Sequence, residues 1–302
     1  MKYVAINNIV RLCLFMFVFI VAICVMNRKT KTRPLQKIDP SSLLLVNDSG
    51  LHFFAGTIHH NWVMLNERHV MFALKNAIEN CRKESGTCIM IDVGMNDGFF
   101  SQMAASLGAK VWSFELQPRC IEIAMNATVA NHFEDTITVI NRPVSAFHNQ
   151  LMTVPHSTTV CSGIFNLGRT DCPQCPRFDK QEGFEKRSYY SIALDSMFPA
   201  PFTIDFMKID VEGHEPQVLQ GAEQLFMDHR VKVLSLESQP KMWSTLNEHE
   251  QRHDAVYRRI LSYGYNFQCA DITSPVYDKS QAKEFLLFLH KNQCTDWKVF
   301  IA

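Results

Sequence analysis

The chain alternates between short apolar runs and longer segments whose apolar residues recur every three or four positions. A continuous apolar run such as 88–93 (CIMIDV) predicts a strand that is buried on both faces of a sheet. A segment with helical periodicity, such as 62–81, predicts an amphipathic helix that covers such a sheet. Strands and helices in turn form right-handed βαβ units, so the pattern predicts an α/β fold with a doubly wound sheet.

The expected elements follow one another from residue 62 to the C-terminus, with a less regular stretch at 141–200. Helices are expected at 62–81, 100–107, 118–132, 215–227 and 250–263. Strands are expected at 88–93, 110–114, 137–140, 204–209, 231–236, 265–269 and 285–290, with a further candidate at 189–194.

The N-terminal segment departs from this pattern. After a short tail, 1–11, residues 12–26 (LCLFMFVFIVAICVM) form an uncharged apolar run that predicts a single-pass signal-anchor, with a cleaved signal peptide as the alternative. A helix of that length spans about 22 Å of a roughly 30 Å hydrocarbon core. This short span favours a Golgi or early secretory membrane. Residues 27–50 are expected to form a polar stem and 51–302 the folded domain.

Two features point to opposite sides of that membrane. More Lys and Arg residues follow the anchor than precede it, which predicts a cytosolic domain. Eight cysteines outside the anchor, an even number, fit disulfides in an oxidising lumen, and a lumenal domain is the expectation. The sequons at Asn47 and Asn126 carry no weight, because this composition gives roughly two by chance. For Cys161, Cys172 and Cys175, which share a proline-rich stretch, a disulfide, free thiols and a metal site stay open.

Charge argues against one class of partner. Thirty Lys and Arg residues balance thirty Asp and Glu residues, and no long basic run lies inside the domain. Nucleic acid, which proteins bind through clustered basic residues, is therefore not an expected partner.

Candidate chemistry begins where the first strand ends, in the segment 92–100 (DVGMNDGFF). Gly94 and Gly98 let the backbone turn tightly and approach a ligand without a Cβ in the way. The N-terminus of the next helix offers backbone N–H groups to an anionic group such as a carboxylate. Asn96 stands where the dinucleotide-binding fingerprint has its second glycine, so the segment is a ligand loop of another kind.

The following strands also end in acidic residues. Glu115 lies 23 residues after Asp92 (115 − 92), near the spacing at which an acidic residue meets ribose hydroxyls in Rossmann-like folds. Asp210 and Glu237 follow two later strands. Ligands of such sheets bind at the carboxyl ends of the strands, so four core strands bring these carboxylates to one rim. The rim is the predicted site.

Two segments carry a resemblance to a known family. IDVGMNDGFFS resembles the first cofactor motif, D-x-G-x-N-x-G, of methyltransferases with a seven-stranded Rossmann-like fold. KIDVEGHEPQVLQGAEQLF resembles the K-I-D-V-E-G-x-E hallmark of FkbM-type methyltransferases, and ALDSM before it resembles a further signal of that family. The resemblance covers roughly residues 86–288. It implies a seven-stranded Rossmann-like sheet with helices on both faces, S-adenosylmethionine as cofactor, and O-methylation, often of a sugar or polyketide hydroxyl.

The resemblance also implies which positions hold the cofactor. Four residues are expected to contact the methionine half of S-adenosylmethionine. Glu115 is expected to contact its ribose, and the segment from Asn141 to Ser145 is expected near its adenine. Asp210 is expected to face the cofactor's amino end or the acceptor. The four residues expected at the methionine half are Asp92, Gly94, Asn96 and Gly98.

Methylation of a hydroxyl requires an aligned oxygen and a group that removes its proton. His214 is the first candidate for that base, because it titrates near neutrality and follows Asp210 and Glu212 closely in sequence. Asp210 with Glu212 or Glu237 could instead bind Mg²⁺, which would orient and acidify a vicinal diol. The sequence leaves both mechanisms open.

The leading hypothesis is a membrane-anchored O-methyltransferase that acts on a hydroxyl of a glycan or another sugar-containing acceptor. One alternative places the same fold on the cytosolic face, where it would methylate a lipid or a small molecule. Another is a Rossmann-like binding module without catalysis, against which the intact cofactor-loop residues argue.

Overall fold

The computed structural model divides the chain into two units, residues 1–39 and 40–302, and the residues that it describes all belong to the second. The predicted anchor, 12–26, lies outside the described residues. None of the described helices is both long and apolar enough to cross a membrane. The described residues are 43–48, 51–56, 63–84, 86–157, 161, 184–238, 247–270, 274–290, 294 and 296–301.

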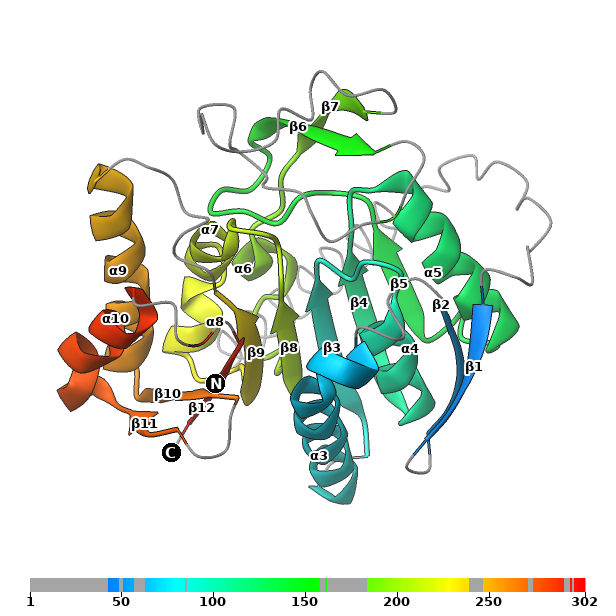
Figure 1. The fold of residues 1–302 in the computed structure, drawn as a ribbon, viewed down its shortest axis with the longest axis horizontal. Helices are drawn as coiled ribbons and strands as arrows, with labels where there is room; N and C mark the ends of the chain where they lie inside the picture. Colours follow the sequence, from blue (N-terminus) through cyan, green and yellow to red (C-terminus); the bar gives the residue numbers. More distant parts are fainter. Residues whose placement is uncertain are drawn as a thin grey trace, which may run out of the picture. The chain divides into compact units, whose positions relative to one another are not determined.

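An eight-stranded sheet forms the centre of the second unit (Figure 1). In spatial order its strands are β11 (Val276–Tyr277), β10 (Tyr265–Cys269), β12 (Asp296–Ile301), β9 (Val233–Glu237), β8 (Phe206–Ile209), β3 (Cys88–Val93), β4 (Ala109–Phe114) and β5 (Ile137–Ile140).

Strands β9, β8, β3, β4 and β5 are parallel, whereas β12, β10 and β11 pair antiparallel at one edge. The chain builds β3, β4 and β5 outward, then crosses back to place β8 on the other side of β3. This reversal of strand order beside β3 confirms the predicted doubly wound sheet. Six of the seven strands predicted from the sequence lie in this sheet, and the other two strands of the sheet, β12 and the two-residue edge strand β11, are not predicted.

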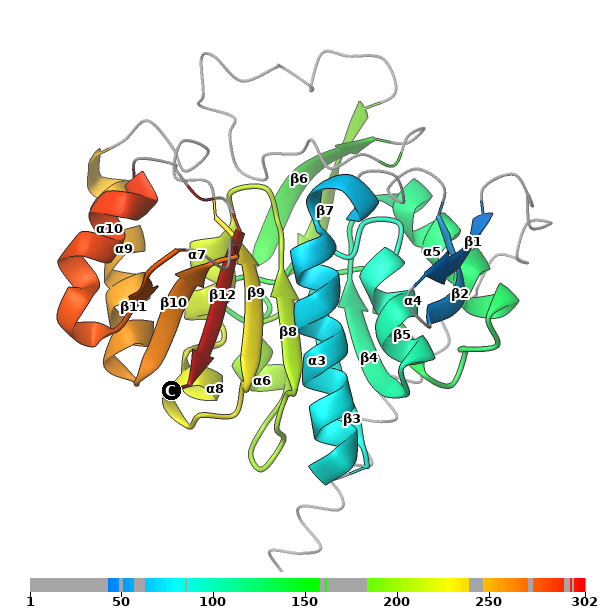
Figure 2. The ribbon, with the colours of Figure 1, turned by 60° about the horizontal axis from the view of Figure 1, so that its bottom comes forward.

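Helices cover both faces of this sheet (Figures 1 and 2). Side chains of α3 and α4 form one buried cluster with β3 and β4, and those of α7 to α10 form another with β8, β9, β10 and β12. The helices are α3 (Arg68–Glu84), α4 (Phe99–Ser106), α5 (Pro118–Ala130), α6 (Leu194–Met197), α7 (Glu215–Gln220), α8 (Glu223–Met227), α9 (Asn247–Ser262) and α10 (Ala282–His290).

Strand β3 shows why its sequence is apolar throughout. Cys88 and Met90 belong to the cluster under α3 and α4, while Ile91 and Val93 belong to the cluster on the opposite face. Alternate side chains of a strand point to opposite faces, so a central parallel strand with helices on both sides has no polar face.

Two hairpins stand outside the main sheet. β1 (Leu43–Asp48) pairs antiparallel with β2 (Leu51–Gly56), so residues 43–48, predicted as part of an irregular stem, form a strand. β6 (Leu151–Ser157) pairs with β7 (Phe184–Tyr190) above the central strands in the view of Figure 1. The strand predicted at 189–194 therefore ends at Tyr190 and lies in this hairpin.

Two further sequence predictions are wrong near the C-terminal half. Residues 285–290, predicted as a strand, belong to α10, in which Phe285 and Leu289 are buried while Leu287 is 56% exposed. That spacing is helical, and the strand between β10 and β9 is β12 instead. The helix predicted at 215–227 is split at Gly221, where a Cβ would stand 2.1 Å from the carbonyl oxygen of Ser145.

Three disulfides join the six described cysteines, while Cys172 and Cys175 lie outside the described residues. The pairs are Cys81–Cys88, Cys120–Cys161 and Cys269–Cys294. Of the options left open for Cys161, the structure therefore has a disulfide, and its partner lies outside the proline-rich stretch.

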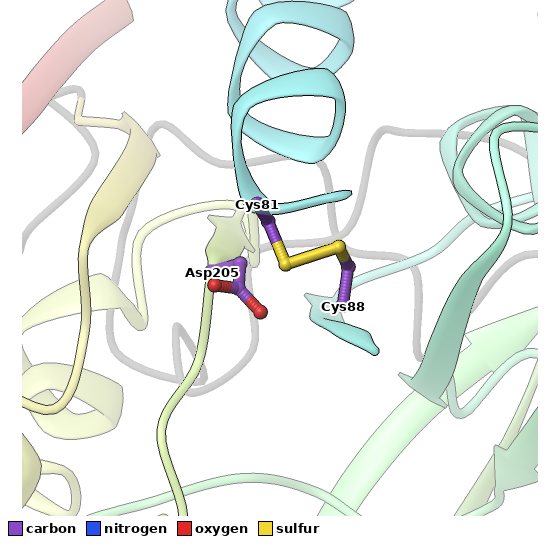
Figure 3. Close-up of side chains that lie close together, drawn as sticks. All are labelled: Cys81, Cys88 and Asp205. Atoms are coloured by element: carbon purple, nitrogen blue, oxygen red, sulfur yellow. A yellow bond between two sulfur atoms is a disulfide. The ribbon is translucent and has the colours of Figure 1, made fainter. Parts of the chain in front are cut away.

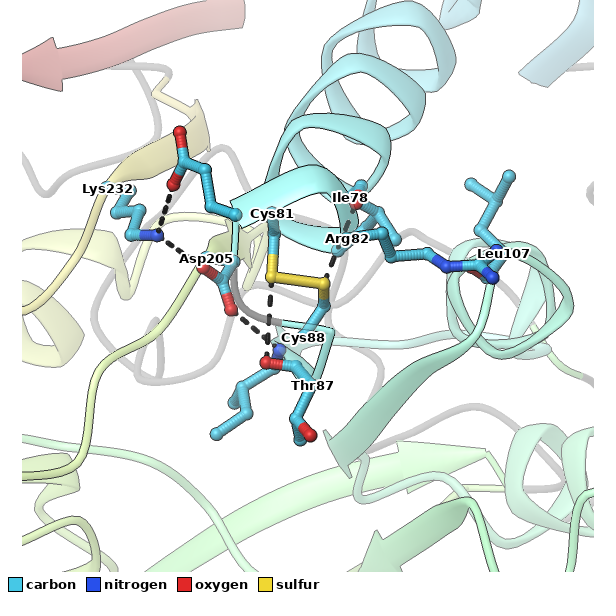
Figure 4. Close-up of a disulfide and its surroundings, with 10 residues drawn as sticks. Ile78, Cys81, Arg82, Thr87, Cys88, Leu107, Asp205 and Lys232 are labelled. Atoms are coloured by element: carbon cyan, nitrogen blue, oxygen red, sulfur yellow. Dashed lines mark hydrogen bonds and ion pairs between the residues drawn. A yellow bond between two sulfur atoms is a disulfide. The ribbon is translucent and has the colours of Figure 1, made fainter.

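The disulfide Cys81–Cys88 fastens the last turn of α3 to the first residue of β3 (Figure 4). Asp205 lies beside it, accepts a hydrogen bond from the N–H of Ile89 at 2.9 Å, and forms an ion pair with Lys232 at 2.9 Å. The side chains of Cys81, Cys88 and Asp205, shown in Figure 3, come close enough to suit a metal ion. The two sulfurs are bonded to each other, however, so the cluster secures the start of β3.

Candidate active site

The loop after β3 is packed between the ends of two neighbouring strands. Gly94 has a φ of 81°, and a Cβ there would stand 1.8 Å from the carbonyl oxygen of Asp210. On the other side, the N–H of Gly94 donates to the carbonyl oxygen of Phe114 at 3.0 Å. Glycine is therefore required first by the close approach of backbone to backbone, and only then by approach of a ligand.

The same loop leads into α4 through Gly98, whose φ is 86°. A Cβ on Gly98 would stand 2.8 Å from the Cβ of Ala124, so this turn packs tightly against α5. No side chain caps the N-terminus of α4. Its first N–H groups, with the positive end of the helix dipole, are therefore suited to an anionic group.

Asp92 is completely buried beneath this loop. Its Oδ2 accepts a hydrogen bond from the hydroxyl of Ser101 at 2.6 Å, and its Oδ1 has no hydrogen-bond partner among the described residues. Burial raises the pKa of Asp92, although Lys208 and the bond from Ser101 act in the opposite direction. The carboxylate thus ties the end of β3 to α4.

Glu115, at the end of β4, is held by three backbone N–H groups. Its Oε2 accepts from Asn96 at 3.0 Å, and its Oε1 accepts from Leu116 at 2.7 Å and Gln117 at 2.8 Å. Burial raises the pKa of Glu115, and these three hydrogen bonds oppose the rise. A carboxylate has about four acceptor positions, so one remains for a ligand hydroxyl.

The segment after β5 contacts the end of β4 and the start of α7. Asn141 donates through Nδ2 to the carbonyl oxygen of Glu115 at 2.8 Å. Ser145 is buried, and its hydroxyl lies 3.0 Å from Nε2 of His214, at the start of α7. The structure therefore brings together two residues, Ser145 and His214, for which the sequence predicts different roles.

Four ionisable side chains meet at the ends of β8 and β9. Lys208 is buried and binds Oδ2 of Asp210 through Nζ at 2.7 Å, and it also lies 5.3 Å from the centre of the Phe100 ring. Oxygens of Asp210, Glu212 and Glu237 all lie within 4.8 Å of one another. We call these three residues the carboxylate cluster. It contains three of the four predicted catalytic residues, and the fourth, His214, is bonded to Ser145.

The crowding of negative charge shifts the protonation of this cluster. Burial, followed by the charge of Asp210, raises the pKa of Glu212 to about 8. Burial, the charge of Asp210 and a hydrogen bond to it raise the pKa of Glu237 to about 11. Burial alone would lower the pKa of Lys208, but Asp210 above all raises it. The raised pKa of Glu237 therefore favours its protonated form at neutral pH, beside Asp210.

Three residues that shape this site have no role predicted from the sequence. Glu215 is buried and accepts from the N–H groups of Val211 and Gly213 at 3.1 and 2.9 Å, which fixes the loop that carries Glu212. Ser101 and Lys208 hold the two aspartates at the strand ends. The alternation of Lys208 with Asp210 is a signal for their pairing, whereas the partner of Asp92 depends on the position of α4.

The raised pKa values predict that stability falls as pH rises. Burial raises the pKa of Glu212 to about 8 and that of Glu215 to about 7, from 4.5 in both cases. Between pH 4.5 and the raised pKa values, the folded protein therefore binds more protons than the unfolded chain. The stability that the two protonated carboxyl groups contribute is fully present below pH 4.5 and is lost as the pH rises through 7 and 8. Thermal unfolding at pH 5 to 8.5 should show a falling Tm.

The variant Glu212→Gln, which keeps a neutral side chain, should show a smaller fall and a higher Tm than the wild type at pH 8.5. Glu284→Gln, at an exposed position on α10, is the matched control and should follow the wild-type profile. Parallel profiles for wild type and Glu212→Gln would show that Glu212 is ionised in the folded protein throughout this range.

Comparison with known proteins agrees with the two strand-end motifs. The family model described as "Methyltransferase FkbM domain" matches residues 92–267, more than half of the chain. An arginine N(omega)-methyltransferase from Streptomyces achromogenes subsp. streptozoticus is 33% identical over 118 residues, which cover 37% of this chain and 31% of that protein. The chain thus matches under a third of the length of this relative.

Solved structures with a related fold include an S-adenosylmethionine-dependent methyltransferase from Agrobacterium tumefaciens, with a TM-score of 0.40, 12% identity and coverage of 89% of this chain and 71% of the other. A putative caffeoyl-CoA O-methyltransferase from Staphylococcus aureus has a TM-score of 0.38, 11% identity and coverage of 80% and 89%. Similarity at this level adds nothing about the site, and the assignment rests on the family match. The chain belongs to the FkbM methyltransferase family.

Proposed function

We propose that the chain transfers a methyl group from S-adenosylmethionine to an acceptor bound at the carboxyl ends of β3, β4, β8 and β9. One observation carries the proposal: these four adjacent parallel strands end in Asp92, Glu115, Asp210 and Glu237, at the point where the strand order reverses. Ligands of doubly wound sheets bind at this position, and the family supplies the class of reaction.

The described residues fit the cofactor at two points. Glu115 is fixed by three backbone N–H groups and keeps an acceptor position for a ribose hydroxyl. The uncapped N-terminus of α4, next to Gly98, suits the carboxylate of the methionine half. We infer that Gly94 and Asn96 complete that side of the site, and that the segment from Asn141 to Ser145 lies near the adenine.

S-adenosylmethionine supplies a methyl group that is already electrophilic, so the protein must align the acceptor and remove its proton. A base is most effective when its pKa lies near the working pH. Glu212, with a pKa of about 8, meets that condition within the carboxylate cluster. Nε2 of His214 is engaged with Ser145. We therefore propose the cluster as the proton acceptor, with His214 as the competing candidate.

The proposed acceptor is a hydroxyl of a glycan or of another sugar-containing molecule. Support comes from the carboxylate cluster, because carboxylate oxygens accept hydrogen bonds from hydroxyl groups and hold them for in-line attack. Mg²⁺ on Asp210, Glu212 and Glu237 is a variant of this proposal, since hard oxygen ligands suit that ion.

A second candidate acceptor is a guanidino nitrogen. The specific observation is that oxygens of three carboxylates lie within 4.8 Å of one another beside Lys208, which binds Asp210, and this concentration of acidic groups would favour a further cation. A guanidinium presents five N–H donors in a fork that matches carboxylates, and its charge would lower their pKa values. The name of the Streptomyces relative, an arginine methyltransferase, adds support.

Mass spectrometry of products formed by membranes from cells that express the chain, incubated with methyl-labelled S-adenosylmethionine, distinguishes these acceptors. A sugar methyl ether is the expected product, and methylarginine would establish the second candidate. EDTA should leave the activity unchanged if the carboxylates act as base, and should abolish it if they hold Mg²⁺. Absence of any labelled product, with bound cofactor, would identify a binding module instead.

We further propose that the domain lies in the lumen of the early secretory pathway, anchored by residues 12–26. The three disulfides support an oxidising compartment. Asn126 is buried in α5, whereas Asn47 is exposed on β1, so only Asn47 is accessible as a glycan acceptor. Endoglycosidase should shift the wild type but not Asn47→Gln, and sealed vesicles should protect the domain from protease. Digestion of an unglycosylated domain would establish the cytosolic orientation.

A further inference from the structure

The disulfide Cys120–Cys161 lies against the proposed cofactor loop. Cys120 is in the first turn of α5, five residues after Glu115, and its partner is 41 residues further along the chain. Both cysteines are buried, and they pack with Ile123 and with Leu43 of the first hairpin. This bond therefore secures Cys161 next to the ends of β3 and β4.

Both sulfurs contact the side chain of one loop residue. Oδ1 of Asn96 lies 2.8 Å from Sγ of Cys161 and 3.7 Å from Sγ of Cys120. A sulfur in a disulfide carries no proton, so these are packing contacts and not hydrogen bonds. They place the disulfide against the end of the Asn96 side chain.

The conformation of Asn96 requires such support. Its φ is 54°, in the left-handed region that residues other than glycine seldom adopt and that surrounding contacts must maintain. In this conformation its N–H donates to Oε2 of Glu115 at 3.0 Å. A change of the Asn96 backbone would therefore remove one of the three N–H groups that fix the carboxylate.

We infer that Cys120–Cys161 is a positioning element of the cofactor site, which holds Asn96 so that Glu115 is oriented for the ribose. The inference rests on the proposed use of S-adenosylmethionine. It makes cofactor affinity depend on a disulfide that lies outside the family's sequence motifs. A bond that merely stabilised the fold would leave that affinity unchanged at temperatures where the protein is folded.

The test compares two cysteine pairs in the full-length protein. Cys120→Ala with Cys161→Ala removes the bond at the site, and Cys269→Ala with Cys294→Ala removes a bond between the end of β10 and a cysteine two residues before β12. The sequence separations are 41 and 25, and the loop-closure entropy varies only with their logarithm, so both pairs should lower Tm to a similar extent.

Calorimetric titration with S-adenosylmethionine, well below either Tm, should show affinity weakened about fivefold or more for the site pair, as expected when a strained backbone is released. The control pair should stay within about twofold of the wild type. Equal affinities for both pairs would overturn the inference while leaving the proposed function intact. A wild type that does not bind S-adenosylmethionine would instead refute the proposed function, and the inference with it.

A second variant, which keeps the disulfide, tests the route through Asn96. Asn96→Gly keeps a backbone that adopts positive φ but lacks the side chain that the disulfide contacts. It should weaken cofactor binding about as much as the site pair does, and removal of the disulfide in the Asn96→Gly background should add no further loss. Additive losses, or a wild-type affinity for Asn96→Gly, would overturn the inference.

Discussion

Asp210→Asn is expected to lower turnover at least a hundredfold, about 2.7 kcal/mol in activation free energy, while the protein stays folded. The replacement is nearly isosteric, but it removes the charge that raises the pKa values of Glu212 and Glu237 and binds Lys208. Asp92 also interacts with the charge of Lys208, so the buried cation keeps a counter-charge in the variant. Initial rates with an identified acceptor, together with Tm, measure the effect.

The matched control is Asp195→Asn, because Asp195 accepts hydrogen bonds from the N–H groups of Gln224 and Leu225 at the start of α8. It should cost about 1 kcal/mol of stability, as the loss of a helix cap does, and leave turnover near the wild-type value. Near-normal turnover of Asp210→Asn would show that the carboxylate cluster is structural.

His214→Ala distinguishes the two candidate bases in the same assay. If the carboxylate cluster accepts the proton, the variant loses the contact with Ser145 but not the base, and turnover should fall by less than about tenfold. If His214 is the base, turnover should fall as far as in Asp210→Asn, and the low-pH limb of the rate profile should change.

Gly94→Ala is expected to prevent the domain from folding. The new Cβ would stand 1.8 Å from the carbonyl oxygen of Asp210, a backbone atom that cannot move without displacing the end of β8. The left-handed φ of 81° adds about 1 kcal/mol for a residue with a Cβ. A cost of several kcal/mol approaches the whole stability of a typical domain, about 5–15 kcal/mol. Soluble yield and thermal unfolding measure it.

Gly86→Ala separates the clash from the backbone conformation. Gly86 has a φ of 77°, close to that of Gly94, but a Cβ there meets nothing within 4 Å. This control should fold and lose only about 1 kcal/mol. If Gly94→Ala were as stable as Gly86→Ala, the packing of the cofactor loop against β8 would be wrong.

The sequence predicts the central strands well because their burial leaves a strong local signal. Residues 137–140 and 265–269 are strands with the predicted bounds, and β3 is the predicted apolar run. A short apolar segment outside the central strands does not distinguish a strand from a helix, because strands and buried helix segments both contain such runs. For this reason the sequence predicts a strand at 285–290, which belongs to α10, and it does not predict β12, an interior antiparallel strand that contains Asp296 and Lys298.

The site shows the same division between position and contact. The parallel direction of the core strands follows from the alternating pattern, so the meeting of Asp92, Glu115, Asp210 and Glu237 at the carboxyl ends of these strands is predictable. The partner of each of these side chains depends on how loops and helices pack around the strand ends.

Three such partnerships have no sequence signal. They are the bond between Asp92 and Ser101, the contact between His214 and Ser145, and the disulfide Cys120–Cys161. Each joins residues whose separation along the chain, 9, 69 and 41, matches no local repeat.

We expect the carboxyl ends of β3, β4, β8 and β9 to bind S-adenosylmethionine, with Glu115 on its ribose. Calorimetric titration of the full-length protein in detergent tests it directly, with NAD as the comparison ligand and Glu115→Gln as the variant. The account predicts a Kd for S-adenosylmethionine between micromolar and millimolar, weakened at least tenfold, about 1.4 kcal/mol, in Glu115→Gln, and no binding of NAD. Tight binding of NAD without any response to S-adenosylmethionine would contradict it.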